Sequence, residues 1–360
     1  MGWIAISHKN GAWVDPVGMG RSAPGARPSP DLIRRGTILI ETRLSAEMRP
    51  QILFAFERTR PGPGRFSLQA LPNGGLVLVD AQGHEMTHGT LPFVSDGRLD
   101  VLRLTYSWDV DAGWARLTLE RPESELIQTV EISEPRPISV DDLRLALEHD
   151  IRCDIGEAVS FVAVSDEIEP VGPMPGLTAD VPITTTQGEK RAAEIVRGDL
   201  VVTDGGDVVP VLQVVKRMVP AHGSFRPIRL RAPYFGLKRD IAVAPQARLV
   251  MHGTQVEYMF GREAVLVPAR HLVNESSAFV AKGPDLVTYH HLLLPGHEVL
   301  MAHECPLESL YIGRLRRKPE ALASSVLAGF DRARLPEHAK PVWPVLKPFE
   351  AITLVTMHAA

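Results

Sequence analysis

Between residues 37 and 164, short apolar runs alternate with turn residues, and the three-to-four-residue spacing of an amphipathic helix is scarce. Four runs have the length of a strand, namely 37–41, 51–56, 66–70 and 76–79. The pair Asn73-Gly74 separates the last two runs, and such a pair favours the tight turn of a hairpin. This part of the chain is therefore predicted to form antiparallel β-structure.

A second hairpin is predicted further along. Residues 99–108 alternate between apolar and polar side chains with a period of two, and residues 114–119 repeat that alternation after a turn at 109–113. Many short strands separated by turns favour a β-sandwich over a barrel or a propeller.

Prolines and a glycine mark the main domain boundary, at residues 167–175. A chain of 360 residues is too long for one typical hydrophobic core. We expect a mainly β protein with a β-sandwich at 1–170, a second all-β domain at 171–312 and a C-terminal segment at 313–360.

The C-terminal segment is expected to begin with a helix. Residues 319–334 place Leu322, Val326 and Phe330 at helical spacing, and this is the one clear helical pattern of the chain. Residues 341–348 are rich in proline, which predicts an extended tail that packs back on the domain.

Composition excludes several classes of protein. With 44% hydrophobic and 23% charged residues, the chain is neither disordered nor a fibrous repeat. A net charge of -4 argues against a protein built around nucleic-acid phosphates. Cys153 and Cys305 are too few for a disulfide framework, so two free thiols are expected.

The termini and apolar runs bear on localisation. Residues 1–9 lack a basic stretch followed by an apolar run, so no cleavable signal is expected, and the chain would be cytoplasmic or exported by a non-classical route. No run reaches the roughly 18 apolar residues of a membrane span. We expect no cofactor.

Five segments after the connector carry recognisable motifs in a fixed order. They are 176–189 (GLTADVPITTTQGE), 194–205 (EIVRGDLVVTDG), 243–250 (VAPQARLV), 269–274 (ARHLVN) and 287–300 (VTYHHLLLPGHEVL).

This ordered set resembles the Hint (Hedgehog/intein) self-processing family, in its bacterial branch. The first segment is similar to a Cys-x-Thr-x-Gly-Thr opening with a Gly-Glu turn, and the second to a Gly-Asp-x-Val element. The third is similar to Ser-Pro-Gln-His-Arg-Val, and the last to Tyr-x-His-Leu-Leu followed by His-Glu. The resemblance implies an all-β Hint-like domain.

Self-processing requires a thiol or hydroxyl that attacks the preceding carbonyl carbon, and an imidazole that protonates the departing nitrogen. When the motifs are aligned with those of the family, Gly176 occupies the position of the nucleophile and Ala247 that of the histidine. Neither residue has the side chain that the role requires. Thr178 lies about 6 to 7 Å along the strand, too far to attack the same carbonyl. Glu308-Ser309 occupies the position at which inteins end in His-Asn, so the asparagine that completes splicing is missing.

Several histidines of the domain have two interpretations: a metal site, or residues such as His291 and His297 that hold strands together by hydrogen bonds. His291, His297 and His303 recur at an even spacing, which on one strand would place them on one face and suggest a metal site. Pro295-Gly296 interrupts that strand, so no metal is expected. The resemblance leaves these vestigial positions without an active group: Gly176, Thr178, Ala247, His271, His291 and His297.

Residues 1–170 resemble the concanavalin/laminin-G type of β-sandwich. Trp108 and Trp114 could form a platform for a sugar, although paired aromatic residues at a hairpin more often pack in the core. Asp109 and Asp111 could bind calcium, but two carboxylates are too few ligands and ordinary turn chemistry is favoured.

Three functions remain open from the sequence. The first is a binding or scaffold protein with a Hint fold that no longer processes itself, with a carbohydrate or a protein as partner. The second is residual autoproteolysis at Pro175-Gly176. The third is an exported carbohydrate-binding or surface protein.

Overall fold

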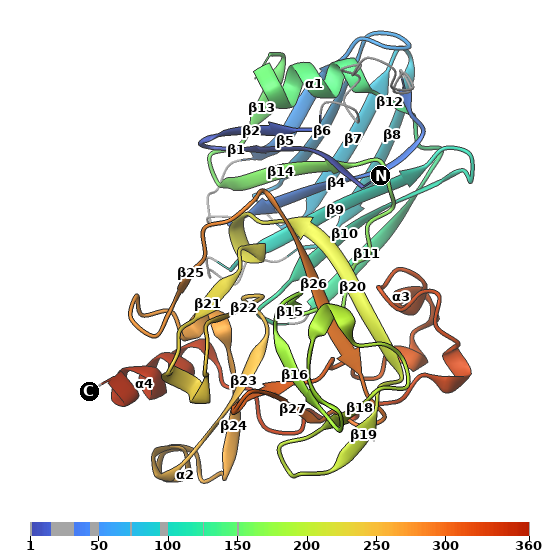
Figure 1. Cartoon of the computed structure of the whole chain (residues 1–360). Coiled ribbons are helices and arrows are strands. Elements are labelled where there is room, and N and C mark those ends of the chain that lie inside the picture. Colours follow the sequence, from blue (N-terminus) through green and yellow to red (C-terminus); the bar gives the residue numbers. More distant parts are fainter. Residues whose placement is uncertain are drawn as a thin grey trace, which may run out of the picture. The chain divides into compact units, whose positions relative to one another are not determined.

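The computed structural model describes residues 2–15, 32–43, 50–72, 74–93, 100–124, 126–149 and 151–359. Backbone contacts divide the chain into two compact units, Met1–Val171 and Gly172–Ala360. Both consist mainly of antiparallel strands with a few short helices (Figure 1). The mainly β fold predicted from the sequence is confirmed.

The first unit contains a seven-stranded antiparallel sheet and a five-stranded antiparallel sheet. The order in the seven-stranded sheet is β11 (Leu126–Ser133), β10 (Trp114–Arg121), β9 (Leu102–Asp109), β4 (Arg35–Thr42), β14 (Val159–Ser165), β1 (Trp3–His8) and β2 (Gly11–Val14). The order in the five-stranded sheet is β13 (Cys153–Ile155), β5 (Gln51–Arg58), β6 (Gly64–Ala70), β7 (Leu76–Gln82) and β8 (Glu85–Leu91). Two short strands, β3 (Leu32–Ile33) and β12 (Ile138–Ser139), pair beside them.

Both predicted hairpins are present. Strands β6 and β7 pair from Gly64↔Gln82 to Ala70↔Leu76, and β9 pairs with β10 across the turn. Asn73 and Leu99 lie outside the described residues.

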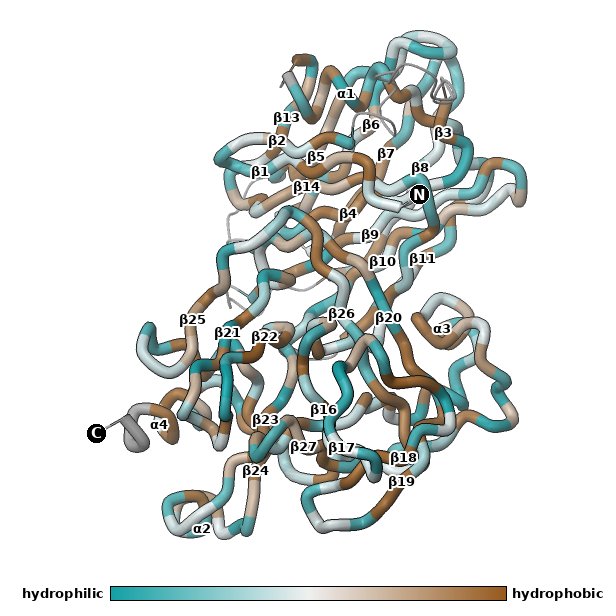
Figure 2. Tube along the Cα trace, in the orientation of Figure 1, coloured by the Kyte–Doolittle hydropathy of each residue, from teal (hydrophilic) through white to brown (hydrophobic). Residues whose placement is uncertain are grey.

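Aromatic side chains from both sheets form the core of the β-sandwich. Phe66 of β6 lies 5.3 Å from Phe56 of β5 and 5.5 Å from Tyr106 of β9, measured between ring centroids. Tyr106 in turn stacks on Trp108 at 5.5 Å. Because strands of both sheets contribute to one buried cluster, the sheets enclose a single hydrophobic core. Figure 2 shows the hydrophobic residues interspersed with polar ones along these strands.

Trp108 is fully buried and holds a fixed position. Its Nε1 donates a hydrogen bond to the carbonyl of Ile33 at 3.1 Å. A Cβ added at Gly36 would lie 2.9 Å from the Trp108 ring and 2.7 Å from the carbonyl oxygen of Ser165, so only glycine fits beside the indole. The packing role predicted for Trp108 is confirmed.

Trp114 lies on the opposite face of the sheet. The register pairs Trp114 with Asp109 and Trp108 with Ala115, and residues directly opposite one another share a face. Trp114 is half-buried, and the guanidinium of Arg116 lies over its ring at 5.5 Å. The two indoles therefore cannot form one platform.

The carboxylates of this hairpin serve the turn. Asp109 Oδ1 accepts a hydrogen bond from the amide of Ala112 at 3.0 Å. Asp111 pairs with Arg34 at 2.5 Å, and this partner lowers the pKa of the carboxyl. The turn chemistry expected of both residues is observed for Asp109, whereas Asp111 forms an ion pair with Arg34 outside the turn.

One helix of the first unit, α1 (Val140–His149), was not predicted. Asp141 and Asp142 stand in its first turn, where carboxylates are favoured, and the Ser139 hydroxyl accepts the amide of Asp142 at 3.3 Å. Leu143 and Leu147 lie four residues apart on its buried face. The capping residues and the leucine spacing are both visible in the sequence, but the strand-like runs around them dominate the pattern.

The second unit contains three sheets. The order in the six-stranded sheet is β20 (Gln213–Pro220), β26 (Leu286–Leu293), β15 (Leu177–Thr178), β22 (Ile241–Val243), β21 (Ile228–Leu230) and β25 (Ala278–Val280). One four-stranded sheet has the order β17 (Gly188–Arg191), β16 (Pro182–Thr185), β18 (Leu200–Val202) and β19 (Val208–Pro210). The other has the order β24 (Ala264–Pro268), β23 (Arg248–His252), β28 (Cys305–Glu308) and β27 (Val299–Ala302).

Short helices complete the second unit. The α-helices are α2 (Thr254–Phe260), α3 (Pro319–Ala323) and α4 (Pro348–Ala359). The 3-10 turns are η1 (Ala192–Glu194), η2 (Gly223–Phe225), η3 (Tyr234–Gly236), η4 (Ala269–His271), η5 (Leu315–Arg317) and η6 (Arg332–Arg334).

The helix predicted at 319–334 is wrong in length, because α3 ends at Ala323. The hydroxyl of Ser324 bonds the carbonyl of Glu320, and that of Ser325 bonds the carbonyl of Leu322. Such local bonds compete with the helix ladder and favour its end.

The tail predicted as extended at 341–348 gives way to a helix at its last residue. Pro348 is the first residue of α4, a position at which proline is favoured because its missing N–H is not needed there. The carboxylate of Glu350 accepts the amide of Lys347 at 2.8 Å, which closes the start of the helix.

The contribution of the two tryptophans can be measured directly. Trp108→Ala removes a buried indole and its hydrogen bond, so it should lower the free energy of unfolding by about 3 to 5 kcal/mol. Trp114→Ala on the opposite face should cost about 1 kcal/mol or less. Urea unfolding followed by circular dichroism measures both. Unchanged stability in Trp108→Ala, with lost retention on a polysaccharide column, would contradict the packing role.

Candidate functional site

The second unit begins at the centre of its largest sheet. Leu177 of β15 pairs with His290 of β26 on one side and with Val243 of β22 on the other. The carbonyl of Gly176 accepts the amide of Ala244 at 2.7 Å. The Thr178 hydroxyl donates to the carbonyl of Ala242 at 2.7 Å, so this hydroxyl is engaged in holding the strand.

Three sequence-predicted positions meet at the start of β15. A Cβ added at Gly176 would lie 3.0 Å from Cβ of Ala247 and 3.3 Å from Cε1 of His291. All three residues are buried. Positions far apart in the sequence are thus brought into direct contact, and two of them have no reactive side chain.

Backbone bonds hold Ala247 at this place. Its amide donates to the carbonyl of Ala244 at 3.0 Å, and its carbonyl accepts the amide of Ala269 at 2.8 Å. The amide of Arg270 donates to the carbonyl of Pro245 at 2.9 Å. The segment 244–247 is therefore fixed on both sides, by β15 and by η4.

His291 is a neutral imidazole in a defined tautomer. Its Nε2 lies 2.9 Å from the carbonyl oxygen of Glu308, and because that oxygen can only accept, Nε2 carries the proton. Nδ1 then carries no proton, and none of the residues that the structure describes forms a hydrogen bond with it. Burial lowers the pKa of His291, which keeps the ring uncharged. The ring could accept a proton, but neither Gly176 nor Ala247 has one to give.

Neither cysteine offers a reactive thiolate at this place. Cys305 of β28 is fully buried, and burial raises the pKa of its thiol to about 12. Cys153 belongs to the first unit, on β13.

A buried polar cluster lies at the end of β28, and its composition was not anticipated from the sequence. Glu308 Oε2 lies 3.2 Å from Nη1 of Arg248 and 3.4 Å from Nε2 of His297. His297 Nδ1 accepts the amide of Val342 at 2.9 Å, so Nε2 carries the proton and faces the carboxylate. The cluster therefore ties the C-terminal segment to β23 and β28.

Two further rings extend this cluster. Tyr311 lies 5.0 Å and His338 lies 5.9 Å from the ring of His297, measured between centroids. His338 accepts the amide of Ile312 through Nδ1 at 3.4 Å and donates from Nε2 to the carbonyl of Leu294 at 3.3 Å. Burial lowers the pKa of His338, so this ring also bonds in the neutral form.

The remaining sequence-predicted histidines lie elsewhere. His271 ends η4, and burial lowers its pKa to about 4, with Arg270 as the second cause. His303 stands in the turn between β27 and β28 and bonds Glu189 at 2.8 Å. His291, His297 and His303 thus bond three different partners and do not share one face.

Two of the recognised motifs are turns with clear physical roles. Gly198 has a φ of +92°, a conformation that favours glycine. The Asp199 carboxylate accepts the amide of Val196 and pairs with Lys190 at 3.0 Å, and the backbone bond and the ion pair lower its pKa. Asn274 Oδ1 accepts the amide of Ser277 at 2.8 Å and shapes the loop before β25.

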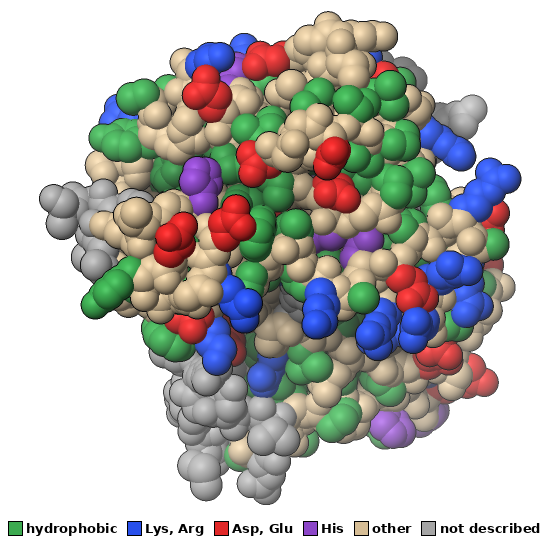
Figure 3. All heavy atoms as spheres, turned by 90° about the horizontal axis from the view of Figure 1, so that it is seen from below, with side chains coloured by type: hydrophobic (Ala, Val, Ile, Leu, Met, Phe, Trp, Pro, Cys, Tyr) green, Lys and Arg blue, Asp and Glu red, His purple; other side chains and the backbone are tan. Residues whose placement is uncertain are grey.

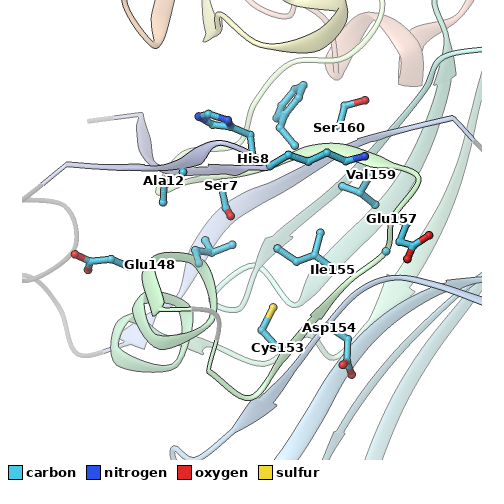
Figure 4. A pocket seen from close by; sticks show the side chains of 15 residues that line it. Ser7, His8, Ala12, Glu148, Cys153, Asp154, Ile155, Glu157, Val159 and Ser160 are labelled. Atoms are coloured by element: carbon cyan, nitrogen blue, oxygen red, sulfur yellow. The ribbon is translucent and has the colours of Figure 1, made fainter.

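The first unit contains a separate cleft of about 560 Å³ beside β1, β13 and the end of α1 (Figure 4). Its polar lining includes Ser7, Lys9, Glu148 and Glu157. In Figure 4 the side chains of Ser7 and Cys153 point toward the centre of the cleft. Neither Trp108 nor Trp114 lines this cleft.

Surface charge is mixed where it can be seen. Figure 3 shows Lys and Arg side chains interspersed with Asp and Glu side chains on one face. Among the described residues, no helix is long and apolar enough to cross a membrane.

At the start of β15, Gly176 thus lies against Ala247 of a loop and His291 of a late strand. Residues 175–314 match a family model described as a Hint domain. This part of the chain is a Hint domain, as the motif order predicted. No curated protein matches the chain.

Several solved structures match parts of this chain at low identity. A carbohydrate-binding module (CBM40) of the Ruminococcus gnavus IT-sialidase, bound to α2,3-sialyllactose, is 18% identical, with a TM-score of 0.24, over 36% of this chain and 62% of that chain. Sheep galectin-11 in complex with glycerol is 11% identical, with a TM-score of 0.22, over 37% and 84%. A splice-inactive variant of the AceL NrdHF class 3 split intein is 12% identical, with a TM-score of 0.28, over 39% and 100%.

The chain spans 62% of the first of these chains.

The buried histidines predict how stability depends on pH. His271, His291 and His338 all have pKa values lowered by burial, so folding favours their neutral form. Their contribution is present above the ordinary pKa of about 6.5 and is lost as the pH falls below it, for His271 down to about 4. The melting temperature should therefore fall between pH 7.5 and pH 5.

His271→Asn isolates one of these groups, because asparagine does not titrate. The drop in melting temperature between pH 7.5 and pH 5 should shrink by about 2 to 4 °C, the shift expected for about 1 kcal/mol in a unit of this size. The expected change in melting temperature is this small because solvent screens the half-buried ring. Differential scanning calorimetry measures the change, and an identical drop in both proteins would contradict the assignment.

Proposed function

We propose that the Hint domain of this chain does not process itself and serves as the structural scaffold of a binding protein. The observation that supports this is the contact between Gly176 and Ala247 beside His291. At the place where a nucleophile and an imidazole would have to meet, the chain has a hydrogen and a methyl group. The imidazole of His291 is present, but no thiol or hydroxyl of Gly176 or Ala247 can use it.

Residual autoproteolysis at Pro175-Gly176 is the second candidate, and one observation favours it. Nδ1 of the buried His291 is bare and unpartnered, and the ring borders Gly176. A water molecule activated by this nitrogen could hydrolyse the Pro175-Gly176 bond. Nothing on Gly176 would assist, so such cleavage would be slow and independent of added thiol.

A carbohydrate as the ligand of the β-sandwich is a further part of the binding proposal. The cleft beside β1 and β13 presents hydroxyl, ammonium and carboxylate groups from Ser7, Lys9 and Glu148, which suit a polar ligand. Retention of the tryptophan variants on a polysaccharide column tests this: retention that survives both substitutions would support the cleft. No retention by the wild-type chain would contradict a carbohydrate ligand.

Restoring the two missing groups tests the proposed cause of inactivity. Gly176→Cys with Ala247→His should recover slow cleavage at the 175–176 bond in dithiothreitol, because a thiolate can then form a thioester that the added thiol intercepts. Each single variant should stay intact. Intact mass spectrometry over about one day at pH 7.5 follows all of them beside the wild type.

The outcomes separate the explanations. The added Cβ at position 176 needs Ala247 to move by a few tenths of an ångström, since the two Cβ atoms would be 3.0 Å apart. A folded double variant that stays intact would show that the backbone at this bond, and not only the missing groups, has departed from a processing site. Cleavage in Gly176→Cys alone would show that His291 suffices as the proton carrier. Cleavage of the wild type would refute the proposal.

A further inference from the structure

Strand β24 forms one edge of its four-stranded sheet, and a segment from the end of the chain lies along that edge. The amide of Leu266 donates to the carbonyl of Pro344 at 2.8 Å, and the amide of Leu346 donates to the carbonyl of Leu266 at 2.9 Å. Leu266 and Val345 form a parallel bridge. Residues 342–346, here called the C-terminal arm, therefore act as an added strand.

Side chains complete the contact. Val250, Ala264, Leu266 and Val299 form a small buried apolar cluster, separate from the main core of the unit. Val342, Trp343 and Val345 of the arm pack against this cluster. We call Val250, Ala264, Leu266 and Val299, together with the backbone of Leu266, the β24 edge site. It combines sequence-independent backbone bonds with an apolar surface that selects side chains.

The arm is anchored at both ends, and its last residue, Leu346, is itself buried in the main core of the unit. Before it, His338 is buried and bonded, whereas Ala339 and Lys340 are exposed. The amide of Val342 donates to His297. Beyond the arm, α4 buries Ala351 and Leu354 in the main core. Within the arm, the two bonds to Leu266 join it to the sheet.

We propose that the β24 edge site is a peptide-binding site for an extended apolar strand, which it binds parallel to β24, and that the C-terminal arm occupies this site in cis. The matching ligand is a peptide with branched or aromatic side chains at the places of Val342, Trp343 and Val345. Prolines favour the extended backbone of such a peptide, which reduces the entropy lost on binding. The arm is covalently attached and therefore has a high effective concentration at this site. An external peptide has to displace it.

This inference deepens the scaffold role proposed above, because it names a surface through which the Hint domain would bind a partner. The two proposals fail separately. Self-cleavage would refute the scaffold role without touching the β24 edge site, and absence of peptide binding would refute the site without touching the mass of the chain.

The test uses the full chain and a fluorescein-labelled peptide with the sequence of residues 340–347. Trp343→Lys with Val345→Lys places two charges in the arm, so the arm should leave the apolar surface while the site itself is unchanged. The peptide should bind this variant saturably in fluorescence anisotropy, and at least about 10-fold more tightly than it binds the wild type, where the arm competes. No saturable binding to the folded variant would overturn the proposal.

Two methylated peptides serve as matched controls. Methylation of the amide of Leu346 removes the N–H that donates to Leu266, so binding should fall at least about 10-fold. Methylation of the amide of Val345 leaves both bonds to Leu266 intact, so binding should persist. Equal affinity of the two methylated peptides would contradict strand addition at β24.

A measurement on the wild type covers the case in which the variant does not fold. Hydrogen exchange should show the amide of Leu346 opening independently of the amides paired between β23 and β24, such as those between Leu249 and Val267. Exchange of the arm only through global opening of the unit would mean that the arm is a permanent part of the sheet, and would overturn the proposal.

Discussion

The close approach of the chain at Gly176 to Ala247 and His291 is the constraint on which the rest of the second unit depends. Strand β15 is only two residues long and yet lies between β22 and β26, so the domain starts inside its own sheet. With a Cβ at position 176 only 3.0 Å from that of Ala247, the two small residues close the interior at this point. Gly176 and Ala247 thus leave no room for a larger side chain at this point unless a neighbour moves.

His291 is buried beside Gly176 and Ala247, two residues without a polar side chain. Its Nε2 donates a hydrogen bond to the carbonyl of Glu308, and its Nδ1 has no hydrogen-bond partner within the described part of the chain. A buried polar atom without a partner costs stability, so the ring is held there by what surrounds it. The same strand end carries Glu308 between Arg248 and His297, and through His297 it holds the C-terminal segment. The region around Gly176 and the attachment of the arm are therefore both connected to Glu308.

Much of this architecture could be predicted from the sequence, for identifiable reasons. The strands of the first unit follow from period-two alternation, and the Hint domain follows from the order of its motifs. Helix α1 was not predicted because Asp141 and Asp142 were not recognised as first-turn residues. Helix α4 was not predicted because the prolines of 341–348 favour an extended tail. The long helix expected after Pro319 failed because the serine hydroxyls at 324 and 325 bond the backbone.

The meeting of Gly176, Ala247 and His291 followed from the family register, but the polar cluster around Glu308 did not. Its members come from β23, β28, the loop before β27 and the segment after η6, and no spacing in the sequence links them. The strand addition by residues 342–346 is of the same kind, since only the pairing with Leu266 distinguishes a docked strand from a loose tail.

The central claim is that the 175–176 bond is stable in the protein as it is. The most direct measurement is the intact mass of the freshly purified wild-type chain, and of the same sample after prolonged incubation with dithiothreitol. The account predicts a single species of 39.5 kDa in both. Two fragments that divide between Pro175 and Gly176 would contradict it.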